Sequence, residues 1–78
     1  MDGQTMIDSG FRDVTGRLKI LLSESPIAEV RKIRVEQEGD QVLLHGRVRT
    51  FYAKQMAQET IRSAVRGLHI VNSVSVDT

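Results

Sequence analysis

The 78-residue sequence contains no cysteine or tryptophan, and only one proline, one tyrosine and two phenylalanines. The lack of cysteine excludes disulfide bonds, thiolate metal ligands and cysteine nucleophiles. No apolar run is long enough to span a membrane, and the N-terminus "MDGQTMIDSGFRD" is polar and acidic where a secretory signal would be basic and then apolar. The chain is therefore expected in the cytoplasm if Met1 is the native start. If the chain is a fragment of a longer protein, a periplasmic or membrane-associated location is expected.

The composition is that of an ordinary globular domain, with 40% hydrophobic and 27% charged residues. The length allows a single core, so we expect one domain over residues 9–78 and a partly ordered N-terminal extension over residues 1–8. The net charge is only +1. Charge is unevenly placed, because residues 41–76 hold five basic side chains and one acidic one, a balance that favours anionic partners.

A first helix is indicated by apolar residues at three- and four-residue spacing, namely Ile7, Phe11, Val14, Leu18, Leu21 and Leu22. Asp8, Ser9 or Asp13 is expected to cap its start. The helix is predicted to end between Ser23 and Ser25, because Pro26 forces the residue before it out of the helical conformation.

Two strands are predicted over residues 30–38 and 41–50, where apolar and polar residues alternate. Gly39 and Asp40 separate them and suit a two-residue hairpin turn, since glycine takes a positive φ without a steric penalty. Gly46 lies on the inward face of the second strand. A glycine inside a strand marks a bulge or a close approach, and we expect a helix to pack against it.

A second helix is predicted to begin after Thr50 as N-cap and to end at Gly67 as C-cap. Its apolar face carries the small residues Ala53, Ala57 and Ala64, which would let the helix lie close to the strand position of Gly46. A third strand rich in Ile and Val follows over residues 69–76 and includes Asn72. We assign Gly39, Gly46, Ala53, Ala57, Ala64, Gly67 and Asn72 structural roles.

The fold class predicted from this order is α+β: an αββαβ two-layer sandwich with two helices packed on one face of a three-stranded mixed sheet. The third strand is expected beside the second, because consecutive elements tend to be neighbours, although a place beside the first strand is also feasible.

Residues from about Val35 to Val76 carry a combination of spacings that is familiar from one family. The matching positions are Val42, Leu44, Gly46 and Val48 in the second strand, then Ala57, Gly67, Val71, Asn72, Val74 and Val76. This pattern resembles the BON domain (bacterial OsmY and nodulation domain). The sequence departs from it at Leu68, where the family usually has valine, and in a slightly longer turn before Val42. The resemblance implies a non-enzymatic binding module that attaches to phospholipid membranes or envelope components.

Neither a catalytic site, a cofactor site nor a metal site is expected. His45 and His69 are the only histidines, and neither has a second ligand at metal-binding spacing. No Gly-x-Ser-x-Gly motif and no glycine-rich phosphate loop is present, so no small-molecule substrate is predicted.

The candidate binding surface is the sheet face opposite the helices. We predict that anions or lipid headgroups bind there to Lys32, Arg34, His45, Arg47 and Arg49. Glu36 is expected to pair with Arg47 across the strands. Phe51 and Tyr52 are expected to pack in the core and its rim, with Tyr52 able to anchor at a membrane interface.

Phospholipid or an envelope protein is thus the first partner prediction. A protein-interaction adaptor or weak homo-oligomer is the alternative, because a three-stranded sheet leaves two unpaired edges. RNA binding is a minor alternative: such platforms stack bases on aromatic side chains, and none is predicted on the open sheet face.

Overall fold

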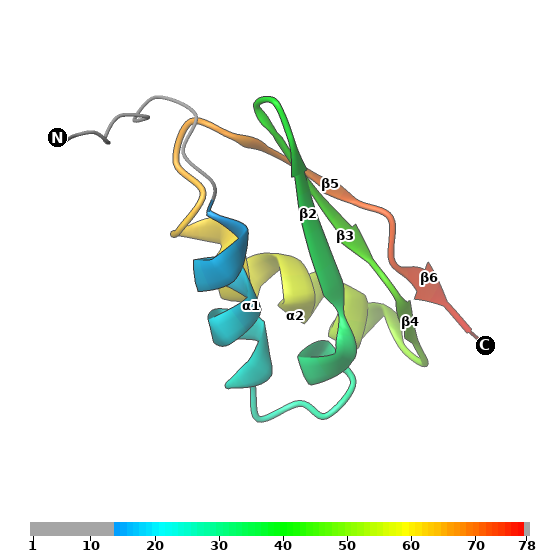
Figure 1. The fold of residues 1–78 in the computed structure, drawn as a ribbon. Helices are drawn as coiled ribbons and strands as arrows, with labels where there is room; N and C mark the ends of the chain where they lie inside the picture. The colour runs from blue at the N-terminus through cyan, green and yellow to red at the C-terminus, as the bar shows by residue number, and fades with distance from the viewer. Residues whose placement is uncertain (1–13, 78) are drawn as a thin grey trace, which may run out of the picture.

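The computed structural model describes residues 14–77. Two helices cover one face of a three-stranded sheet, and a short two-stranded ladder extends the sheet at one end (Figure 1). The elements in chain order are helix α1 (Thr15–Ser23), the 3₁₀ turn η2 (Val30–Lys32), strands β2 (Arg34–Glu38), β3 (Gln41–His45) and β4 (Arg47–Val48), helix α2 (Phe51–Arg62), and strands β5 (His69–Asn72) and β6 (Ser75–Val76). The predicted α+β fold with the order αββαβ is confirmed.

Helix α1 ends at Ser23, within the range predicted from Pro26. The backbone N–H of Glu24 donates to the carbonyls of Ile20 and Leu21 at 3.1 and 3.3 Å, which satisfies the last turn. Leu18 and Leu22 are fully buried one helical turn apart and anchor α1 on the sheet. The earlier part of the predicted helix, with its expected caps Asp8, Ser9 and Asp13, lies outside the described residues.

Strands β2 and β3 form the predicted antiparallel hairpin, with Glu38 paired to Gln41 across the turn. Gly39 has a φ of 59°, as the turn requires. The prediction that the first strand starts at residue 30 is wrong, because Val30–Lys32 forms a 3₁₀ turn in which the Ile33 N–H bonds the Val30 carbonyl. The three-residue period of this turn buries both Val30 and Ile33, whereas a strand would send them to opposite faces.

Gly46 divides the second predicted strand into β3 and β4. Its φ of +150° lies in a region that other residues rarely adopt. The expectation that a helix packs against Gly46 is wrong: a Cβ added there would lie 3.0 Å from Cδ1 of Ile33, and no atom of α2 lies within 4 Å. The side-chain gap therefore accommodates Ile33, at the start of the neighbouring strand.

Strand β5 pairs in parallel with β3, which gives the order β2–β3–β5 and confirms the predicted mixed sheet. The third predicted strand is also interrupted, at Ser73 and Val74, so that β6 pairs with β4 as a separate ladder. Hydrogen bonds from Ser73 N to Leu44 O and from Ser75 N to Gly46 O, both 2.9 Å, carry the pairing through the interruption. The two ladders are thus one parallel pairing with a bend.

Helix α2 packs on the sheet through Ala53, Ala57 and Ile61, all of which are buried. The predicted end at Gly67 is wrong, because the helix ends at Arg62 with Ser63 as C-cap. After Arg62, hydrogen bonds between residues three apart, such as Ala64 N to Ile61 O and Val65 N to Arg62 O, tighten the chain into turns. These turns still bring Ala64 and Leu68 against the core, and Gly67, with φ +80°, lies in the turn before β5.

Thr50 caps α2 as predicted, because its Oγ1 accepts a hydrogen bond of 3.1 Å from the Ala53 N–H. Replacing Thr50 with alanine is expected to lower the free energy of unfolding by about 1 kcal/mol, since an N–H in the first turn loses its partner. Thr50→Ser keeps the hydroxyl and is the matched control. Urea denaturation would measure both variants, and equal stability of the alanine and serine proteins would contradict the capping role.

Candidate functional site

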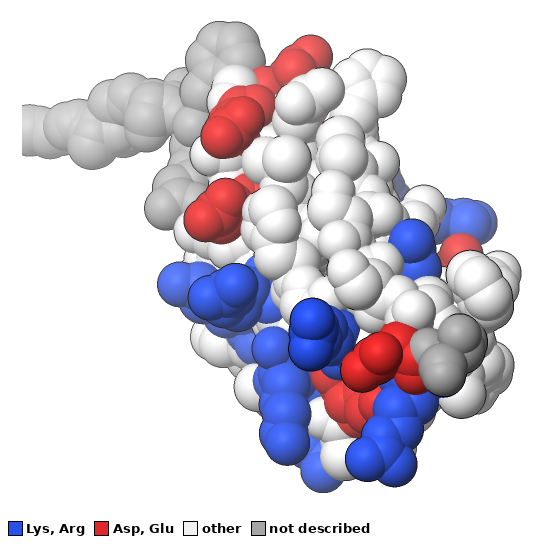
Figure 2. All heavy atoms as spheres, turned by 90° about the vertical axis from the view of Figure 1, so that its right-hand side faces the viewer, with Lys and Arg blue, Asp and Glu red and all other residues white. Residues whose placement is uncertain are grey.

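The open face of the sheet consists of the β2 and β3 side chains that point away from the helices, together with their neighbours on β5. The register pairs Glu38 with Gln41 near the hairpin, Glu36 with Leu43 in the middle, and Arg34 with His45 at the far end. Charge therefore changes from acidic to basic along the sheet. Figure 2 views the side of the molecule on which the sheet lies and shows acidic residues at the upper end, and Lys and Arg gathered in the lower half together with further acidic residues.

Beside Glu36, the open face carries an apolar pair. Leu43 is paired with Val71 of β5, and both side chains are half-buried. No Phe, Tyr or Trp belongs to β2, β3 or β5, and the rings on these strands are the imidazoles of His45 and His69.

The five predicted site residues lie at the far end of the sheet, and we call them the basic end: Lys32, Arg34, His45, Arg47 and Arg49. Arg34 and His45 are directly opposite each other across β2 and β3. Arg47 continues the line in β4, and Lys32 lies on η2, next to the start of β2. The Lys and Arg side chains are all exposed, and that of His45 is half-buried.

Carboxylates also lie among these cations. Exposed Asp77 follows β6, and its backbone N–H donates to the Val48 carbonyl at 2.7 Å. Oε2 of Glu29 accepts a 2.8 Å hydrogen bond from the backbone N–H of Arg49, so Glu29 fixes the backbone after β4. Oε1 of Glu36 lies 3.3 Å from Nε2 of His45, although this contact lacks hydrogen-bond geometry. The expected Glu36–Arg47 pair is wrong, because the register places Leu43 opposite Glu36. The guanidinium groups of the basic end have no carboxylate partner among the ion pairs of the described residues.

Two exposed aromatic side chains follow the basic end directly. Phe51 is 71% exposed and Tyr52 is 64% exposed, both in the first turn of α2. The expectation that they pack in the core and its rim is wrong. The helical period predicts the exposure of Phe51. Ala53 faces the sheet, and Phe51, two residues earlier at 100° per residue, lies on nearly the opposite side of the helix.

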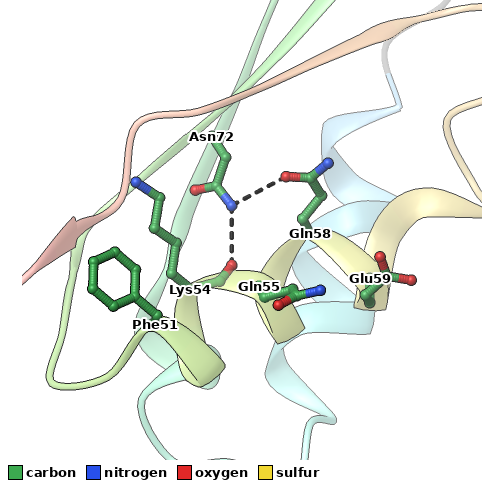
Figure 3. A pocket seen from close by; sticks show the side chains of 6 residues that line it. All are labelled: Phe51, Lys54, Gln55, Gln58, Glu59 and Asn72. Atoms are coloured by element: carbon green, nitrogen blue, oxygen red, sulfur yellow. Dashed lines mark hydrogen bonds between the residues drawn. The ribbon is translucent and has the colours of Figure 1, made fainter.

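A shallow hollow of about 360 Å³ lies beside α2, lined by Phe51, Lys54, Gln55, Gln58, Glu59 and Asn72. Figure 3 shows the Asn72 side chain reaching from the sheet to the helix between Phe51 and Gln58. Its Nδ2 donates to the Lys54 carbonyl at 3.0 Å and to Oε1 of Gln58 at 3.3 Å, while Oδ1 accepts from the Val74 N–H at 3.2 Å. The amide is therefore engaged in joining β5 to α2, whereas Phe51 and Gln55 of the same lining are exposed.

Within residues 14–77, no group of three or more His, Asp or Glu side chains is placed to hold a metal ion. The same residues include no helix that is both long and apolar enough to cross a bilayer. What the surface offers is cations and exposed aromatic rings around one end of the sheet, which suits binding.

The fold is that of a small α+β module, with two helices on one side of a mixed sheet and an open face on the other. The family model of the BON domain matches residues 12–78. The chain therefore belongs to the BON domain family, whose domain is a non-catalytic module. A search of curated proteins gave no match to the sequence.

Proposed function

We propose that this domain binds the surface of anionic phospholipid membranes through the basic end and the aromatic pair Phe51–Tyr52. The observation that carries the proposal is the succession, over six residues, of two exposed arginines and two exposed aromatic rings: Arg47, Arg49, Phe51 and Tyr52. Stable binding to a membrane surface needs two contributions. Here the cations supply electrostatic attraction, and the aromatic side chains at the same end of the sheet supply apolar contact.

The electrostatic part follows from the exposed cations. Each Lys or Arg near an anionic bilayer contributes about 1 kcal/mol, and the effect falls off within about one Debye length. Lys32, Arg34, Arg47 and Arg49 are all exposed, so they can approach lipid phosphates without first losing buried partners. The neighbouring Glu29 and Glu36 reduce this attraction. Binding is therefore expected to weaken strongly with salt and to require anionic lipid.

The aromatic part follows from the place of Phe51 and Tyr52. Tyrosine prefers the headgroup level of a bilayer, where its ring is partly apolar and its hydroxyl remains solvated. Phenylalanine gains by removing ring surface from water. Both rings lie in the first turn of α2, whose position is fixed by the Thr50 cap and by buried Ala53. The rings can thus enter the interface without a change in the fold.

Liposome flotation tests the proposal. Wild-type protein is expected to float with vesicles that contain phosphatidylglycerol and not with pure phosphatidylcholine vesicles. Arg47→Glu combined with Arg49→Glu is expected to weaken binding by at least roughly 30-fold, from about 1 kcal/mol per lost cation. The matched control is Arg62→Glu with Arg66→Glu, which makes the same change in net charge where α2 ends and just beyond. Absence of binding to any liposome would remove the proposal.

Tyr52 offers a second, independent readout, because it is the only tyrosine and the chain has no tryptophan. Its fluorescence is expected to be quenched by brominated anionic lipid when the ring enters the interface. Phe51→Ala is expected to weaken vesicle binding while its salt dependence stays the same. Flotation with unchanged tyrosine emission would show that charge acts alone and would contradict the role of the aromatic pair.

A further inference from the structure

A second basic surface lies along the outer side of β2. Within residues 14–77 the strand order β2–β3–β5 leaves this side of β2 without a neighbouring strand. A hollow of about 480 Å³ borders it, and we call it the edge groove. Its charged lining residues are Lys19 of α1, Arg31 and Lys32 of η2, and Arg34 and Glu36 of β2. Three separate elements therefore direct four cations and one carboxylate toward a single strand edge.

The backbone of β2 also offers hydrogen bonds to this groove. The carbonyls of Asp40 and Leu44 bond to the β5 segment, so the alternate residues of β3, Gln41, Leu43 and His45, are the ones that bond to β2. Their partners are Glu38, Glu36 and Arg34. The N–H and C=O groups of Val35 and Gln37, between these partners, consequently point to the outer edge. Val35 lines the edge groove, and Gln37 lies just beyond it, where its Oε1 accepts a 3.1 Å hydrogen bond from the Val14 N–H. No strand among residues 14–77 pairs with these groups, and such a row is a template for an added strand.

From these two observations we propose that the edge groove binds an extended acidic segment of a partner protein, which adds a strand beside β2. Main-chain bonds to Val35 and Gln37 would give the segment its direction and register. Carboxylates on one face of the added strand would meet Lys19 and Arg31, and those on the other face would meet Arg34. Glu36 disfavours a carboxylate beside it, which limits where acidic residues can stand along the segment.

An acidic segment fits the groove better than a free phosphate or a lipid headgroup. A strand edge presents donors and acceptors in alternation, and a peptide backbone satisfies both, whereas a phosphate can satisfy only the donors. The cations of the groove come from three elements, α1, η2 and β2. The other sheet edge has no such charge, since β5 contains neither Lys nor Arg.

This proposal does not depend on membrane binding. Lys32 and Arg34 border both surfaces, but Lys19 lines only the edge groove, and Arg47 and Arg49 belong only to the basic end. Variants at these unshared positions therefore separate the two proposals. Lys19→Glu tests the groove, and Arg47→Glu with Arg49→Glu tests the basic end.

The experiment uses a short fluorescent peptide in which glutamate and valine alternate. Binding to the full chain is expected, with NMR shifts concentrated on the amides of Val35 and Gln37. A peptide with lysine in place of glutamate should not bind. A peptide with N-methyl groups on alternate residues keeps its charge but loses the donors that face β2, and it is expected to bind at least roughly tenfold more weakly.

Lys19→Glu is expected to weaken binding of the acidic peptide by roughly threefold to tenfold, as for the loss of an exposed ion pair and its replacement by a repulsion. Arg17→Glu is the matched control, because Arg17 is exposed on the same helix but does not line the groove. The affinity of the Arg17→Glu protein for the acidic peptide should stay close to that of the wild type.

Four results would overturn the proposal. They are no binding of the acidic peptide, equal binding of the N-methylated peptide, full competition by inorganic phosphate at the peptide's own concentration, and loss of binding in Arg47→Glu with Arg49→Glu but not in Lys19→Glu. The second and third would reveal a simple anion site, and the fourth would place the peptide on the basic end.

Discussion

Leu44→Ala is expected to lower the free energy of unfolding by about 2–5 kcal/mol, the range for emptying a fully buried leucine site. Leu44 is inaccessible to solvent in the central strand β3, between Val35 of β2 and Asn72 of β5. A domain of 78 residues has about 4–12 kcal/mol of stability in total. The substitution would therefore remove a large fraction of it, as measured by urea denaturation followed by circular dichroism.

The neighbouring Leu43 supplies a control of the same chemistry. Its side chain is half-buried on the open face, so Leu43→Ala removes less buried surface and leaves no enclosed cavity. Leu43→Ala is therefore expected to lower the free energy of unfolding clearly less than Leu44→Ala does. A loss at Leu43 equal to or greater than that at Leu44 would contradict the assignment of inner and outer faces in β3.

Gly46→Ala is expected to cost about 1–3 kcal/mol, which is the usual cost of holding a residue with a side chain in a sparsely populated backbone region. The φ of +150° at Gly46 is the main cause. The new Cβ would also lie 3.0 Å from Cδ1 of Ile33, but this atom is the end of a flexible side chain and can move. Denaturation in urea would give the difference directly.

Two variants separate the backbone contribution from the steric one. Ile33→Val removes Cδ1, so if backbone conformation dominates, Gly46→Ala should cost nearly as much in the Ile33→Val protein as in the wild type. Gly39→Asn is the second control, because Gly39 has a φ of 59°, a conformation that asparagine tolerates, and open space around its Cβ position. Disappearance of the Gly46→Ala cost in the Ile33→Val protein would show that crowding is the cause.

Much of the architecture was predictable, because its signals are local. The alternation of apolar and polar residues predicted the β2–β3 hairpin, and Gly39 predicted its turn. Thr50 predicted the N-cap of α2, and Pro26 predicted where α1 ends. The neighbours of β3 followed from the rule that consecutive elements lie side by side. Each of these features depends on a few adjacent residues or on a general rule of topology.

The errors have a common physical origin in tertiary contacts. Val30–Lys32 has a strand-like pattern, but burial of both Val30 and Ile33 favours a 3₁₀ turn. The apolar spacing of α2 continues past Arg62, yet the chain tightens into turns that bury Val65 without further helix. In both places the pattern identified which residues are buried and not the backbone conformation that buries them.

The candidate surfaces were predictable to different degrees. Exposed cations on the open face follow from alternation, and Arg34, His45 and Arg47 do lie in one region. The exposure of Phe51 and Tyr52 was missed because large aromatic residues are usually buried, although their position on the helix opposed it. The edge groove could not be predicted, because Lys19 and Arg34 come together only through the packing of α1 against β2.

The parallel pairing of β3 with β5 affects how the domain is made. During synthesis the ribosome releases the hairpin and α2 first, and the central strand then has one open flank until His69–Asn72 emerges. Until then Val42 and Leu44 lack part of their cover, so the nascent domain is open to misassociation until β5 pairs with β3. Parallel pairing over a long sequence separation is slow compared with hairpin formation, so we expect the sheet to be completed after the β2–β3 hairpin has formed.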